Sequence, residues 1–200
     1  MRLRILDRGH RLRQRLALRA IGLIGRTDAD PVVKLSLYRP ELFGRQFLRL
    51  GESVMRGPSD WSPGERELMG AFVSRLNDCR FCAGIHEGTT SLLLGPESGV
   101  ENLSDWRERG FEPRVAATFG LLEKVTLSPD TVGPADIARV RAAGASEAAI
   151  ADALYLCFLF NTINRIANAM DFSWHTDANR MKLAAGLNRI QYHTPRFMLR

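Results

Sequence analysis

The chain has 200 residues, of which 45% are hydrophobic and 25% charged, a composition typical of a globular protein with a core of its own. Its net charge of +6 is concentrated at the start, because residues 1–26 hold eight arginines and one acid, which leaves a charge of −1 for the rest. A nucleic-acid-binding domain would spread basic residues over a folded face with aromatic residues between them, so we predict no nucleic-acid partner.

Membrane-spanning and secreted proteins are also disfavoured. The longest apolar run, 150–160, contains Asp152 and is shorter than the roughly 20 residues that span a bilayer. Arginines interrupt every apolar stretch near the start, so the hydrophobic core of a signal peptide is absent. Three cysteines are too few for a secreted disulfide scaffold. We therefore expect a cytoplasmic protein.

The first 30 residues are predicted to form a basic amphipathic arm. Apolar residues recur there at helical spacing: Leu12, Leu16, Ala20 and Leu23. We favour a surface or docking helix with solvated arginines. A membrane-surface anchor and an arm that wraps a neighbouring subunit remain alternatives. Thr27 to Pro31 is predicted to be a loop.

The rest of the chain is predicted to be helical, since no alternating apolar run bounded by turns suggests a strand. Helices are expected at 40–56, 63–76, 79–94, 114–126, 134–144, 147–170 and 177–187. The predicted fold is all-α, with about seven or eight helices and short connections. We place the main helical domain at 31–175, followed by a C-terminal helix and basic tail at 176–200.

A candidate carboxylate lies on the predicted helix at 63–76. Ser62 and Glu65 have the spacing of a capping box that would start this helix. Glu67 lies off the apolar stripe, on a side whose small residues allow another helix to approach closely: Gly70, Ala71 and Ser74. We therefore expect Glu67 to be pressed into a helix contact.

The most informative stretch holds Cys79, Cys82 and His86. On a helix that starts at Cys79, these side chains share one stripe within about 60° of arc. The amides of a first helical turn and a nearby imidazole both favour the thiolate over the thiol. Glu67 could orient His86 or hold a water that shuttles a proton. Thiolate attack on a peroxide, followed by condensation with the second thiol to a disulfide, would then be feasible.

Other interpretations of the cysteine pair have less support in the sequence. Structural zinc usually needs a second, separate ligand pair, which the sequence lacks. Covalent haem would need histidine directly after Cys82, where Ala83 stands, and a thioredoxin fold would need strands. Plain core cysteines remain open, although they would not explain the spacing of His86 and Glu67. We predict no metal and no bound cofactor.

The pattern Glu67-x11-Cys79-x2-Cys82-x3-His86 resembles the signature of the AhpD-like alkylhydroperoxidases, within the carboxymuconolactone decarboxylase superfamily. The resemblance extends over about 38–172. It implies an all-helical fold that forms homo-oligomers and a thiol-dependent peroxidase served by a dithiol reductant protein or small thiol. It also implies that Cys82 attacks the peroxide, that Cys79 is the more accessible resolving cysteine, and that Glu67 and His86 relay protons.

Further polar residues follow on the predicted helix at 147–170. They form one stripe: Asn161, Asn164, Arg165 and Asn168. We favour a structural role in helix contacts, and as an alternative they line the cysteine pocket, with Arg165 holding the thiolate or pairing with Glu67. Cys157 is predicted to be a core residue. His10, His175 and His193 receive no role.

Two other functions stay open beside the peroxidase. The cysteine pair could be a redox switch or a disulfide-exchange centre that responds to peroxide without rapid turnover. Alternatively, a helical oligomer could use the pair to bind a metal.

Overall fold

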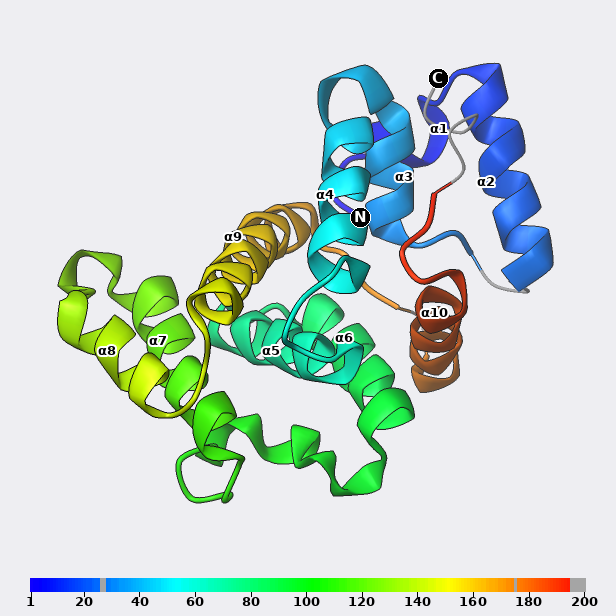
Figure 1. Ribbon diagram of the computed structural model, residues 1–200. Helices are drawn as coiled ribbons and strands as arrows, with labels where there is room; N and C mark the ends of the chain where they lie inside the picture. Colours follow the sequence, from blue (N-terminus) through cyan, green and yellow to red (C-terminus); the bar gives the residue numbers. More distant parts are fainter. Residues whose placement is uncertain (26–27, 175, 195–200) are drawn as a thin grey trace.

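The computed structural model describes residues 1–25, 28–174 and 176–194, and all regular structure in these ranges is helical (Figure 1). The all-α prediction is confirmed. The predicted number of helices was too low, because the described residues form ten α-helices. They are α1 (Ile5–Arg8), α2 (Leu12–Gly25), α3 (Pro31–Tyr38), α4 (Arg45–Arg56), α5 (Pro63–Leu76), α6 (Arg80–Leu94), α7 (Pro113–Leu127), α8 (Pro134–Ala142), α9 (Glu147–Met170) and α10 (Asp177–Ile190).

The largest difference from the sequence prediction lies between residues 28 and 45. Asp30 caps α3 by accepting the Val32 amide N–H at 2.6 Å, and Pro31 occupies the first helical position. A π-helical turn, Pro40–Gly44, then leads into α4. Gly44 lies so close to α3 that a Cβ atom would be 1.9 Å from the Ser36 carbonyl oxygen. Thr27, part of the predicted loop, lies outside the described residues.

Helix starts that rest on capping residues agree with the sequence. The Ser62 hydroxyl accepts the Glu65 amide N–H at 3.2 Å, and the Glu65 carboxylate accepts the Ser62 amide N–H at 2.7 Å. Ser146 caps α9 in the same way, accepting from the Ala149 amide at 3.0 Å. These side chains satisfy amides that a helix itself leaves unpaired, so the helix begins where they stand.

Helix α5 lies at the centre of the bundle and contacts α4, α6, α7 and α9 (Figure 1). One face packs into the main core, where the rings of Phe72 and Phe119 stack at 4.2 Å. The opposite face meets α6 and α9, and a Cβ atom on Gly70 would lie 2.4 Å from the Phe160 ring. As predicted, the small residues let helices approach closely, and Glu67 on this face is fully buried.

The start of the chain and helix α10 both contact the helical body. Near the start, the Arg2 amide donates to the Met170 carbonyl oxygen at 2.8 Å. Helix α10 packs against α6 on the side away from α7 and α8 (Figure 1). The predicted domain boundaries stay predictions, and residues 195–200 of the predicted tail lie outside the described residues. Over the described ranges, no helix has the length and apolar character needed to cross a membrane.

Candidate active site

The cysteine pair sits at the amino end of α6. Cys79 is the N-cap residue, and its Sγ accepts the Cys82 amide N–H at 3.5 Å. The preceding Asp78 has a φ of 51°, which turns the chain sharply from α5 into α6. This turn places Cys79 in line with the unpaired amides of the first helical turn, where the positive end of the helix dipole favours an anion. Cys79, Cys82 and Cys157 are all free thiols.

The two thiols of the pair influence each other's ionisation. A hydrogen bond from the Cys82 thiol lowers the pKa of Cys79 below that of a free thiol, and the amide N–H groups of Cys82 and Phe81 act in the same direction. The same thiol contact, together with burial and the charge on Cys79, raises the pKa of Cys82 well above its usual range. The pair therefore gives up its first proton from Cys79, while the second proton is held between the two sulfurs.

Glu67 and His86 are hydrogen-bonded to each other. The Glu67 Oε2 atom lies 2.6 Å from His86 Nδ1. An ionised carboxylate can only accept, so Nδ1 carries the hydrogen and Nε2 of a neutral ring is left as the proton acceptor. Phe160 packs edge-on against the imidazole with ring centroids 4.6 Å apart. The predicted contact between the two side chains is confirmed.

Two further side chains bind Glu67, and the sequence prediction missed both. Arg56, at the end of α4, donates from Nη2 to Glu67 Oε1 at 2.6 Å. Tyr192, which follows α10, has its hydroxyl 3.0 Å from Oε1 and 3.2 Å from Oε2. Neither residue stands in a motif or at a helical spacing from Glu67, so only the tertiary fold brings them together.

This network keeps the buried carboxylate charged. Burial by itself would raise the pKa of Glu67, but the hydrogen bonds and charges of His86 and Arg56 outweigh it, so the pKa is lowered. Burial and the charge of Glu67 raise the pKa of Tyr192 well above its usual range, which keeps its hydroxyl protonated and able to donate. Glu67 is therefore an anion held by an arginine, a tyrosine and a histidine.

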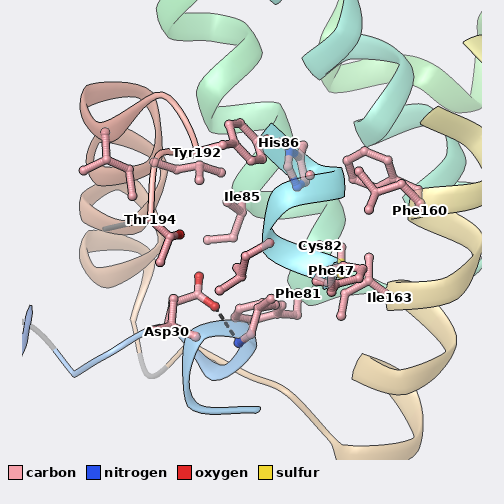
Figure 2. Close-up of a pocket in the computed structure, with 17 residues that line it drawn as sticks. Asp30, Phe47, Phe81, Cys82, Ile85, His86, Phe160, Ile163, Tyr192 and Thr194 are labelled. Atoms are coloured by element: carbon pink, nitrogen blue, oxygen red, sulfur yellow. Dashed lines mark hydrogen bonds between the residues drawn. The ribbon is translucent and has the colours of Figure 1, made fainter. Parts of the chain in front are cut away.

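Cys82 and His86 line a cavity of about 130 Å³ that Figure 2 shows in close-up. Its wall is mostly apolar and comes from the start of α3, from α4, α6, α9 and α10, and from the segment after α10. Representative lining residues are Val32, Phe47, Phe81, Ile85, Phe160, Ile163 and Ile190. Asp30 supplies a carboxyl group to this wall, and burial raises its pKa. An apolar compound with one polar end would fit such a site.

The two cysteines differ in their position relative to this cavity. Cys82 lines it and Cys79 does not. Their exposed fractions are 4% for Cys82 and 1% for Cys79. Both thiols are buried, so the expectation that Cys79 is the more accessible of the two stays a prediction. Asn164 of α9 hydrogen-bonds toward both sulfurs.

The polar residues on α9 have mostly structural partners. Asn164 is fully buried and donates to Ser74 Oγ at 3.1 Å, and Asn168 donates to the Asn77 carbonyl oxygen at 2.8 Å. The alternative role for Arg165 is wrong: its guanidinium bonds the Asn161 carbonyl and side-chain oxygens, and Arg56 is the arginine on Glu67.

Cys157 and the remaining histidines lie elsewhere. Cys157 is fully buried in the main core, as predicted. His10 lies 2.8 Å from the Lys34 carbonyl oxygen, and His193 lies 3.0 Å from Glu52. His175 is outside the described residues. Within the described ranges, no group of three or more His, Cys, Asp and Glu side chains is arranged to hold a metal ion.

Comparison with solved structures gives the fold. The chain superimposes on the crystal structure of the AhpD core of an uncharacterized peroxidase-related protein from Ralstonia eutropha JMP134 with a TM-score of 0.73 at 19% identity, over 89% of this chain and 93% of that one. The chain has an AhpD-like fold. A similar match, with a TM-score of 0.71 at 23% identity over 80% of this chain and 83% of the other, is to an uncharacterized peroxidase-related protein from Silicibacter sp. TM1040.

Sequence comparison adds one relative. The chain is 29% identical over 106 residues to the uncharacterized protein YdfG of Bacillus subtilis, a stretch that covers 52% of this chain and 72% of YdfG. No family model matches the sequence. The AhpD-like fold predicted from the cysteine signature is thus supported by the structural matches.

Proposed function

We propose that this AhpD-like protein is a thiol-dependent peroxidase that reduces organic hydroperoxides with the dithiol of Cys79 and Cys82. One observation carries the proposal: a thiol pair at a helix amino end lies one turn from an imidazole whose other nitrogen is held by a buried carboxylate. The solved structures of the same fold are titled peroxidase-related, which supports the same reaction class.

In the proposed reaction, the Cys79 thiolate takes the proton of Cys82, and the resulting Cys82 thiolate attacks the outer peroxide oxygen. The O–O bond breaks, Cys82 becomes a sulfenic acid, and the departing alkoxide takes a proton to leave as an alcohol. Cys79 then attacks the Cys82 sulfur, which releases water and forms the disulfide. In total, two thiols and one hydroperoxide give a disulfide, an alcohol and water.

We assign the attack to Cys82 because it is the cysteine that lines the cavity. The mainly apolar wall favours an alkyl or aryl hydroperoxide over hydrogen peroxide. Glu67 and His86 serve as the proton relay: Glu67 fixes the ring so that Nε2 accepts a proton from a thiol and returns it to the departing oxygen.

The cycle needs an external reductant, which we propose is a dithiol protein or a small thiol.

We also propose that the protein is a homo-oligomer. Helix α9 supports this, since it exposes 61% of Tyr155 and 62% of Phe158 on its surface. Light scattering on Phe158→Glu should then show smaller particles than wild type, and an unchanged mass would remove this surface from the interface.

The test is consumption of cumene hydroperoxide with dithiothreitol as reductant. Cys82→Ser should abolish consumption with the helical fold retained, as judged by circular dichroism. Cys157→Ser is the matched control, because it alters an equally buried thiol outside the site, and it should retain activity. Full activity in Cys82→Ser would remove the assignment.

A second candidate is a redox switch that forms the disulfide once and is not rapidly reduced. The burial of both sulfurs favours it, because a protein dithiol must reach one of them to restore the pair. Rapid disulfide formation with one equivalent of cumene hydroperoxide, and no turnover with any added dithiol, would support the switch. Continuous turnover would support the peroxidase.

A further inference from the structure

The segment after α10 contacts the charged groups of the site at three successive residues. Gln191 accepts from Arg56 Nε at 2.8 Å, and the Tyr192 hydroxyl reaches both oxygens of Glu67. His193 Nδ1 lies 3.0 Å from the Glu52 carboxylate. Residues 191–193 are therefore docked on α4 and α5, the two helices that hold the Arg56–Glu67 pair.

The backbone of this segment is in an unusual conformation. Gln191 and Tyr192 have φ values of 50° and 63°, in the left-handed region that residues with side chains rarely adopt. For a bulky side chain such as tyrosine, this conformation persists only where surrounding contacts enforce it. Those contacts are the hydrogen bonds to Glu67 and the packing of the Arg56 guanidinium over the Tyr192 ring at 4.7 Å.

We propose that Tyr192 is a positioning residue of the site, whose hydroxyl locks the Glu67 carboxylate and, through it, the His86 ring. The significance for catalysis rests on the proposed peroxidase function, whereas the positioning itself does not. The C-terminal segment, which the cysteine signature does not include, would then complete the site.

The donor set around Glu67 explains why the hydroxyl matters. Arg56 binds Oε1, His86 binds Oε2, and Tyr192 lies within hydrogen-bonding distance of both oxygens. With donors on both oxygens and one between them, the carboxylate cannot rotate without breaking a hydrogen bond. Tyr192 also lies 3.4 Å from His86 Nδ1, so its ring borders the contact that fixes the imidazole.

The charged and titratable groups around this hydroxyl come from several elements. They are Asp30 before α3, Arg56 of α4, Arg66 and Glu67 of α5, and His86 of α6. Removing the hydroxyl leaves the charge of Glu67 less compensated while the other groups stay. The potential at the imidazole becomes more negative, which favours its protonated form.

The test follows the ¹⁵N resonances of the His86 ring against pH in full-length protein, with His86→Gln used to assign them. In Tyr192→Phe, the His86 titration curve should move toward higher pH than in the wild-type protein. Tyr155→Phe is the matched control, because its hydroxyl lies on the exposed face of α9, and it should leave the curve in place. A variant that only loosened the fold would reduce the dispersion of the NMR resonances, but it would not move the His86 titration curve toward higher pH.

A second variant separates the hydroxyl from docking of the segment. His193→Ala removes the contact with Glu52 and leaves Tyr192 intact, so the His86 curve should stay in place. The proposal would be overturned if the His86 titration curve did not move in Tyr192→Phe, or if it moved by the same amount in His193→Ala. Because the measurement uses no peroxide, a shifted curve in a protein without peroxidase activity would reject the proposed function and keep Tyr192 as a positioning residue.

Discussion

Two buried thiols of the protein, Cys79 and Cys157, lie in environments with opposite effects on ionisation. Cys79 is 1% exposed and Cys157 is fully buried, yet the pKa of Cys79 is lowered and that of Cys157 is raised. Cys157 lies in the main core, where burial outweighs its contacts with Thr126 at 3.5 Å and Asn161 at 3.2 Å. Cys79 has a second thiol and the amides of a helix start beside it. Donors to the sulfur, rather than exposure, separate the thiol whose pKa is lowered from the one whose pKa is raised.

The largest effect is expected from altering Glu67, the carboxylate of the proposed proton relay behind the cysteine pair. Glu67→Gln keeps an acceptor for Arg56 but removes the charge that orients His86, so peroxide consumption should fall by about 10²–10⁴. Asp136→Asn is the control, because it alters a carboxylate bound by Lys124 at 2.6 Å, away from the thiols. Rates within a few-fold of wild type for Glu67→Gln would assign Glu67 a structural role only.

The next largest effect should come from removing the second thiol. Cys82→Ala takes away the donor that contributes most to the low pKa of Cys79. Each unit by which that pKa rises reduces the thiolate fraction about ten-fold, so alkylation of Cys79 by iodoacetamide at pH 7 should slow by about that factor. Cys157 in the same sample serves as the internal reference and should react at its wild-type rate. Unchanged Cys79 reactivity would show that the helix amides alone suffice.

Two asparagines on α9 sharpen the comparison further. Asn164 lowers the pKa of Cys79, and Asn161 lowers that of Cys157. Asn164→Ala should therefore slow alkylation of Cys79 a few-fold and spare Cys157, whereas Asn161→Ala should do the reverse. Residue-resolved mass spectrometry measures both rates in one digest. Equal effects of the two variants on both thiols would indicate a general loosening of α9.

The smallest effect is expected for Cys157 itself. Cys157→Ala removes a core sulfur that touches neither His86 nor the cavity. Peroxide consumption should stay within about two-fold of wild type, while the free energy of unfolding should drop by about 1 kcal/mol, the typical cost of a core substitution. A large loss of activity would place Cys157 in the reaction after all.

Local signals explain which parts of the fold could be predicted from the sequence. Ser62 with Glu65 and Ser146 cap helices through contacts within four residues, so they could be read directly. The order of Cys79, Cys82 and His86 on one helix follows from spacing alone. The start of α3 was missed although Asp30 and Pro31 carry the same kind of capping signal.

The rest of the site depends on contacts between distant residues. Arg56 ends α4, and Tyr192 follows α10 in a left-handed backbone conformation, 125 residues from the Glu67 carboxylate that it binds. No periodicity or motif links these positions. The burial of Cys79 is likewise a product of α9 packing over the start of α6, so its exposure could not be predicted from the helix alone.

The most direct measurement is the pH dependence of alkylation of each cysteine, resolved by mass spectrometry in the wild-type protein. Burial slows the reagent at every site, but the pH midpoint of each curve reports ionisation rather than access. The pKa directions given above place the midpoint of Cys79 below that of a free thiol and the midpoint of Cys157 above it. A Cys79 midpoint at or above that of Cys157 would contradict the account of the pair as a thiolate-forming centre.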